Sequence, residues 1–151
     1  LGAAGVALGA RKPPLDPRRV VVAGFEDLSG NPALAPFAHL SAHWVTEGLT
    51  RGGLVDVAPA AITEHLDAAG IRALAEASGA RTVVLGSYYG DGDSVRFQIQ
   101  IVDAEQGILR RALPPVSAPS GAPQLAADAI RRGVAAAVDT LFGRQLNNQN
   151  P

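Results

Sequence analysis

The chain has no cysteine and no methionine, and its 151 residues include only one tryptophan, two tyrosines and four phenylalanines. Without cysteine it can form neither a disulfide framework nor a cysteine-ligated zinc site, and it has no catalytic thiol. An excess of charge of one sign is also missing, because 13 basic residues face 14 acidic ones and the formal net charge is -1. This balance argues against a dedicated nucleic-acid-binding protein.

Apolar residues are plentiful, since 47% of the chain is hydrophobic, which excludes wholesale disorder. The length suits one compact domain and is sufficient for a core without covalent staples. Basic charge is almost entirely arginine, with Lys12 the one lysine, as in proteins encoded by GC-rich bacterial genomes.

The two ends differ from the body. Residues 1–10 are small and apolar, and Arg11, Lys12 and a proline-rich stretch follow them. Ten helical residues span about 15 Å, half of what a bilayer core needs. Since the chain opens on Leu1, we expect it to be part of a longer protein whose membrane anchor or signal segment ends here. A flexible alanine- and glycine-rich tail is the alternative.

This pattern divides the chain into three parts. They are an anchor end with its linker (1–18), a folded domain (19–143) and a polar tail (144–151).

The first half of the domain alternates strands and helices. Short β-branched runs predict strands, and glycine or proline marks the ends of the amphipathic helices. The expected elements are a strand at 19–25, a loop at 26–31, a helix at 36–51, a strand at 54–57, a weak helix at 60–66 and a helix at 71–78.

The second half changes to a period of two. A strand is expected at 82–89, and residues 94–103 place Val95, Phe97, Ile99 and Ile101 on one face with polar residues on the other. A last strand at 108–116 contains Pro114 and Pro115, as an edge strand can, and a long helix follows at 125–142. The order βαβαβββα predicts an α/β (α+β) fold with a single mixed sheet, parallel early and antiparallel late, and helices packed on it.

Several segments together resemble the TolB amino-terminal-domain-like family, which is related to the FlgO-like and CsgG-like envelope proteins. The resemblance covers about residues 19–116. Its carriers are VVVAGFEDLSG (20–30), TEGLTRGG (46–53), IRALAEASGA (71–80), the strand 82–89 and the V-x-F-x-x-x-I-x-D-x-x-x-G hairpin within 93–107. Asp27 departs from the asparagine usual in the family.

The resemblance implies a non-catalytic domain of the cell envelope. Such domains also occur beside membrane-anchored bacterial Ser/Thr kinases and regulators. It favours an extracytoplasmic, periplasmic location, whereas Arg11 and Lys12 beside an anchor would favour the cytoplasm.

The loop after the first strand carries Glu26, Asp27, Ser29 and Asn31. A calcium loop needs a longer run with a final bidentate glutamate, and a phosphate-binding loop needs a Gly-Lys-Ser/Thr sequence after the glycine. We therefore expect Ser29 and Asn31 to satisfy backbone N–H groups of the turn. A small-molecule site near this loop is the alternative.

The helix at 36–51 places His39, His43 and Glu47 on one face. This spacing can present metal ligands, but the glutamate beside the first histidine of a zinc hydrolase is missing. The opposite face of this helix is apolar and is expected to be buried, so the face with the histidines is expected to be exposed to solvent. The residues of the buried face are Phe37, Leu40, Ser41, Trp44, Val45 and Gly48.

Four residues are candidates for a protein interface: Tyr88, Phe97, Arg110 and Arg111. Tyrosine and arginine are favoured in interfaces, although Tyr88 also suits a half-buried core position and the arginines suit a solvated surface. No nucleophile elbow surrounds any serine of the strands.

We therefore expect a non-catalytic, membrane-tethered interaction domain without cofactor or metal. It would serve as an accessory or scaffold subunit of a bacterial membrane complex, or as the sensor module of a membrane receptor. A small-molecule-binding sensory module is the alternative. The sequence leaves the oligomeric state open.

Overall fold

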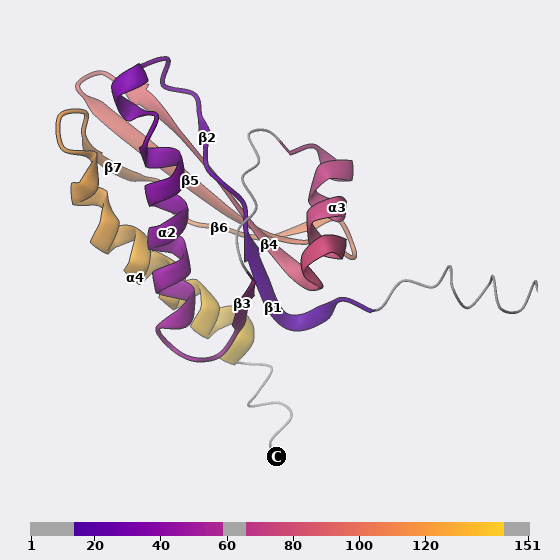
Figure 1. Ribbon diagram of the computed structural model, residues 1–151. Coiled ribbons are helices and arrows are strands. Elements are labelled where there is room, and N and C mark those ends of the chain that lie inside the picture. Colours follow the sequence, from indigo (N-terminus) through magenta and orange to yellow (C-terminus); the bar gives the residue numbers. More distant parts are fainter. Residues whose placement is uncertain (1–13, 59–65, 144–151) are drawn as a thin grey trace, which may run out of the picture.

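The computed structural model describes residues 14–58 and 66–143 (Figure 1). Its strands are β1 (Asp16–Val22), β2 (Glu26–Asp27), β3 (Asp56–Ala58), β4 (Ala80–Asp91), β5 (Ser94–Asp103), β6 (Ile108–Ala112) and β7 (Val116–Pro119). Its helices are α2 (Phe37–Thr50), α3 (Ala68–Ser78) and α4 (Ala127–Val138), with the short turns η1 (Pro32–Leu34), η2 (Pro123–Ala126) and η3 (Asp139–Gly143).

The seven described strands form one mixed sheet. Its order is β3–β1–β4–β5–β6, with β2 also paired to β4 and β7 to β5. β1 is parallel to β3 and β4, whereas β5 is antiparallel to β4, β6 and β7. The fold class and the division into parallel early and antiparallel late strands, both predicted from the sequence, are confirmed.

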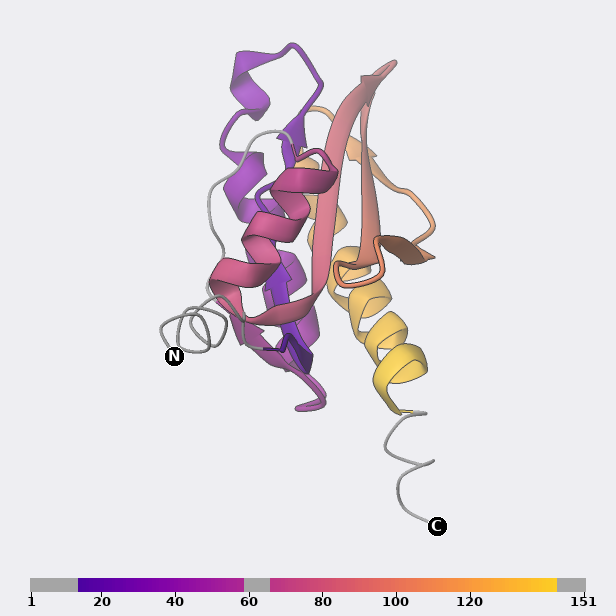
Figure 2. The same cartoon turned by 90° about the vertical axis from the view of Figure 1, so that its right-hand side faces the viewer.

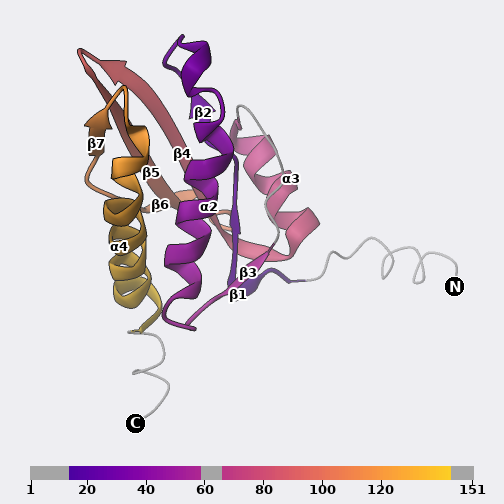
Figure 3. The ribbon, with the colours of Figure 1, turned by 60° about the vertical axis from the view of Figure 1, so that its left-hand side comes forward.

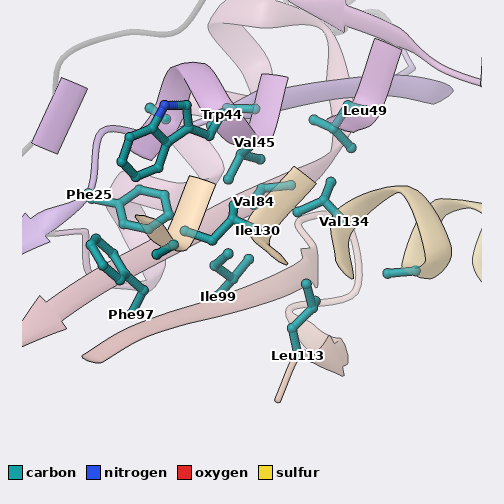
Figure 4. Close-up of a cluster of buried hydrophobic side chains, with 14 of the residues drawn as sticks. Phe25, Trp44, Val45, Leu49, Val84, Phe97, Ile99, Leu113, Ile130 and Val134 are labelled. Carbon is teal, nitrogen blue, oxygen red and sulfur yellow. The ribbon is translucent and has the colours of Figure 1, made fainter. Parts of the chain in front are cut away.

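One face of the sheet is covered by α2 and α4, which lie side by side (Figure 3). Trp44 and Val45 of α2, Ile130 of α4 and Phe97 of β5 meet in the larger of two apolar clusters (Figure 4). The helices approach closely at Gly48, where a Cβ atom would lie 2.7 Å from the carbonyl oxygen of Arg131. Glycine is therefore needed at this crossing.

The opposite face carries α3, which faces the reader in Figure 2. α3 begins at its N-cap Asp67, whose side chain accepts a hydrogen bond from the Gly70 N–H, and ends at Gly79 with φ 75°. Leu74 and Ala75 of α3 pack on Val21 and Val83 of β1 and β4, in a second and smaller cluster. The side chains of β5 on this face are polar except for Val102.

The structure changes several boundaries expected from the sequence. The strand expected at 54–57 is β3 at Asp56–Ala58, and the two-residue β2 lies within the expected loop. The single strand expected at 108–116 is divided into β6 and β7, because Pro114 and Pro115 lack the N–H groups that a continuous ladder requires. Leu40, expected in the buried face of α2, is 42% exposed.

Other expectations fall outside the described residues. They are the anchor end at residues 1–13, most of the weak helix at 60–66, and the polar tail at 144–151. Within the described ranges, no helix has the length and apolarity needed to cross a membrane.

Candidate interaction surface

Tyr88 and Phe97, two of the predicted interface residues, lie in the core. Both are almost completely buried, and their ring centroids are 5.5 Å apart. The Tyr88 hydroxyl donates a hydrogen bond to the Leu34 carbonyl oxygen at 2.6 Å. Burial, together with the nearby Asp27 carboxylate, raises the pKa of Tyr88 well above its usual range. The structure therefore places both side chains in the core, where the Tyr88 hydroxyl links β4 to the η1 turn.

The loop residues Asp27, Ser29 and Asn31 are engaged in the turn itself. The Asp27 carboxylate accepts from the Ser29 N–H at 2.8 Å, and the Ser29 hydroxyl accepts from the Asn31 N–H at 3.1 Å. Asn31 in turn accepts from the Ala33 N–H and so caps η1. The expectation that Ser29 and Asn31 satisfy backbone N–H groups is confirmed, and their side-chain oxygens accept hydrogen bonds within the turn.

Glu26 instead borders a cleft of about 200 Å³ on the α3 side of the sheet. In register, Glu26 lies opposite Ser87 of β4, and Ser87 lies opposite Gln98 of β5. Gln100 adds a second amide to the same face. The remaining lining residues are Ala23, Gly24, Leu66, Leu85 and Gly86. The cleft therefore combines one carboxylate with neutral hydrogen-bonding groups.

Glu47, on the histidine face of α2, forms an ion pair that the sequence did not indicate. Glu47 lies 3.6 Å from His43 Nε2 and 3.2 Å from Arg131 Nη2 of α4. The Glu47 carboxylate thereby links α2 to α4. Among the described residues, no group of three or more histidine, aspartate or glutamate side chains is placed to hold a metal ion.

The other two predicted interface residues, Arg110 and Arg111, lie on β6 at the edge of the sheet. The Arg110 guanidinium lies 5.3 Å from the centre of the Phe142 ring, in a cation–π contact. Arg111 is exposed. Within the part of the chain that the structure describes, neither guanidinium forms a hydrogen bond or an ion pair.

β6 also exposes two large apolar side chains that the sequence analysis did not single out. Ile108 is 51% exposed and Leu109 is 54% exposed. The other exposed large hydrophobic residues of the described chain, Leu28, Leu40 and Leu125, lie on three separate segments. The signal in the sequence was the run Ile-Leu-Arg-Arg at 108–111, shortly before Pro114 and Pro115, because adjacent apolar side chains at a sheet edge invite pairing with another chain.

A hollow of about 240 Å³ adjoins β6. It is lined by Pro17, Arg81, Asp103, Gln106, Ile108 and Arg110. Among these residues, Asp103 receives a hydrogen bond from Arg81 Nε at 3.0 Å and two more from the backbone N–H groups of Glu105 and Gln106. Glu105 lies 3.2 Å from the same Arg81 nitrogen. The charge of Arg81 is thus balanced locally, whereas the charges of β6 are not.

Comparison with solved structures shows a shared fold at low sequence identity. A point variant of the PelC dodecamer from Paraburkholderia phytofirmans has a TM-score of 0.58 and 19% identity, with 83% of this chain and 93% of that chain covered. Lipoprotein GNA1162 from Neisseria meningitidis has a TM-score of 0.52 and 17% identity, with 80% and 99% covered. TolB from Acinetobacter baumannii is also matched, with a TM-score of 0.49 and 15% identity over 87% of this chain and 30% of TolB.

The sequence matches no protein-family profile and no curated protein sequence. The resemblance expected from the sequence is supported in its coarse form, as a fold that this chain shares with a bacterial lipoprotein. The expected links to FlgO, CsgG and Ser/Thr kinases stay predictions.

Proposed function

We propose that this chain is a non-catalytic, membrane-tethered interaction domain on the extracytoplasmic side of a bacterial membrane. It acts as an accessory or scaffold subunit of a membrane complex, or as the sensor module of a membrane receptor. The observation that carries the proposal is the pair of exposed apolar side chains, Ile108 and Leu109, on an edge strand that no described strand covers. Exposed apolar groups on an edge strand are typical of surfaces that another chain covers.

Two further points support this function. The fold is shared with a lipoprotein and with a protein that assembles as a dodecamer, so it is compatible with attachment and with assembly. The apolar segment at residues 1–10, followed by Arg11 and Lys12, has the composition of the end of an anchor.

The test uses the full-length protein, tagged and expressed in its bacterial host. We expect it to pellet with membranes, to resist release by high salt, and to run in mild detergent as a complex larger than the monomer. The double variant Ile108→Ser/Leu109→Ser should shift this complex to lower mass while the circular dichroism spectrum stays unchanged. A matched control is Leu28→Ser/Leu125→Ser, which removes apolar groups that are at least as exposed and lie away from β6.

Two results would overturn the proposal. One is a wild-type protein that fractionates as a soluble monomer. The other is a complex whose mass does not change in the β6 variant, or changes equally in the control.

A small-molecule-binding sensory module is the second candidate, and the cleft beside Glu26 favours it. Ser87, Gln98 and Gln100 converge there with one carboxylate, which suits a small polar ligand. Its volume of about 200 Å³ is below the usual range for ligand pockets. A rise in the melting temperature with a polar metabolite, abolished by Gln98→Leu and retained in Gln124→Leu, would favour this function over the first.

A further inference from the structure

β6 ends the sheet and leaves one side of its backbone without a strand partner in the described chain. In a β-strand, alternate N–H and C=O groups point to opposite sides, so an edge strand offers a row of unmade hydrogen bonds. An extended segment of another chain can use this row by adding as the next strand. The backbone of β6 therefore requires an extended binding partner, and the side chains of β6 determine which residues that partner carries.

The side chains of β6 combine apolar surface with uncompensated positive charge. Arg110 and Arg111 have no carboxylate partner in the described chain, while Ile108 and Leu109 are about half exposed. Asp103, which lines the same hollow as Arg110, and its neighbour Glu105 both already pair with Arg81. A binding partner that supplies carboxylates would form ion pairs with these two arginines.

A second copy of the chain fits this edge poorly. Antiparallel self-pairing centred on Arg110 would place Arg110 opposite Arg110 and Leu109 opposite Arg111. Like charges directly opposite one another destabilise a strand pair. The two ends of the chain are equally unsuited, since residues 1–12 carry two cations, residues 144–151 carry one, and neither segment contains an acidic residue.

The register of β6 adds a second restriction. Arg111 lies opposite Ile101 and Leu109 opposite Val102, so Arg110 is the extra residue of a bulge. A bulge twists an edge and limits the segments that can pair with it. The hollow of about 240 Å³ beside Ile108 and Arg110 can receive one side chain of such a segment.

From these observations we infer that β6 is the docking strand for an extended segment of a partner protein that alternates acidic and apolar residues. The segment adds to the sheet beside β6, with its carboxylates on the face that carries Arg110 and Arg111 and its apolar residues on the opposite face, over Leu109. This inference rests on the proposed function and names the chemistry of the partner.

The experiment measures binding of a labelled peptide with alternating glutamate and valine to the full 151-residue chain by fluorescence anisotropy. We expect binding that weakens as salt is added. Arg110→Glu/Arg111→Glu should weaken it by at least about tenfold, and a lysine–valine peptide should then bind this variant instead. The matched control, Arg51→Glu/Arg132→Glu, makes the same charge change on the helices and should bind like the wild type.

Strand addition is separated from charge attraction by two further peptides. Each carries N-methyl groups on alternate residues, one set on each backbone edge, so their charges are identical. One should bind like the parent peptide and the other should lose binding, because strand addition uses one edge only. Equal binding of both would overturn strand addition.

The remaining outcomes overturn the inference in distinguishable ways. Charge-dependent binding to phosphatidylglycerol vesicles without peptide binding would identify a lipid surface. Self-association removed by Arg110→Glu/Arg111→Glu would identify a second copy. If the Ile108→Ser/Leu109→Ser variant loses the cellular complex but no acidic peptide binds the wild type, the proposed function stands and the acidic-strand inference fails.

Discussion

The two faces of the sheet differ in how they are covered. On one face, α2 and α4 enclose an aromatic and aliphatic core. On the other, the described helix α3 covers mainly β1 and the start of β4, and the adjoining face of β5 is polar except for Val102. β5 shows the contrast within one strand, because Phe97 is buried while the neighbouring Gln98 is exposed. The larger apolar core thus lies on one face, whereas the opposite face is partly polar and the outer edge of β6 has no strand partner in the described chain.

The largest effect on stability is expected for two neighbouring residues of β5 whose side chains lie on opposite faces of the sheet. Phe97→Ala removes a ring that packs 6.2 Å from Trp44 and 5.5 Å from Tyr88, between centroids. It should lower the free energy of unfolding by about 3–5 kcal/mol. Gln98→Ala should change it by no more than about 0.5 kcal/mol. Urea unfolding followed by circular dichroism measures both, and similar losses would mean that the faces do not differ.

Much of this fold could be predicted because its signals are local. The alternation from Val95 to Ile101 identified the buried face of β5, and Gly79 correctly ended α3. The errors in the strand boundaries arose where the hydrophobic pattern favours a continuous strand but the backbone cannot form its hydrogen bonds. β6 and β7 read as one strand because residues 108–116 are mostly compatible with a strand, yet two consecutive prolines interrupt its hydrogen bonds.

The candidate site was less predictable because it depends on register. The alternation of β5 already placed Phe97 on the buried face, but only the register, in which Tyr88 lies opposite Phe97, shows that Tyr88 belongs to the same face. Arg110 and Arg111 were identified by their type, which suits interfaces. Ile108 and Leu109 were not, because apolar residues in a strand are ordinarily assigned to the core, and their exposure follows from the position of β6 at the edge.

A glycine pair on β4 gives a second test of the covered face. A Cβ atom at Gly86 would overlap the ring of Phe25, whereas at Gly90 it would meet nothing within 4 Å. Gly86→Ala should therefore lower the free energy of unfolding by about 1–3 kcal/mol through overpacking. Gly90→Ala should be within about 0.5 kcal/mol of the wild type in the same urea titration. Equal effects would show that Phe25 moves aside freely.

The tyrosine pair tests the same contrast with pH. Tyr88→Phe removes the hydrogen bond to the Leu34 carbonyl and should cost about 1–2 kcal/mol, whereas Tyr89→Phe removes a partly exposed hydroxyl and should cost less. The pKa of Tyr88 is raised in the folded chain. Its contribution to stability is therefore complete below the unfolded pKa of about 10 and is lost as the pH rises above it.

The measurement is the free energy of unfolding from pH 8 upward, alongside phenolate absorbance. The wild type and Tyr89→Phe should both lose stability above about pH 10, and Tyr88→Phe should lose less. A Tyr88→Phe variant with the same alkaline slope as the wild type would contradict the buried, neutral phenol.

The smallest effect is expected at the rim of the covered face, where Arg131 Nη2 of α4 lies 3.2 Å from Glu47 of α2. If the apolar core holds this face together, Glu47→Gln should lower the free energy of unfolding by only about 0.5–1 kcal/mol, since both side chains are partly exposed. The substitution does not leave Arg131 without an acidic partner, because Arg131 keeps its ion pair with Asp128 at 2.9 Å. The loss should shrink further at high salt, where exposed charges are screened. A loss comparable to that of Phe97→Ala, independent of salt, would instead make this ion pair a principal link between the two helices.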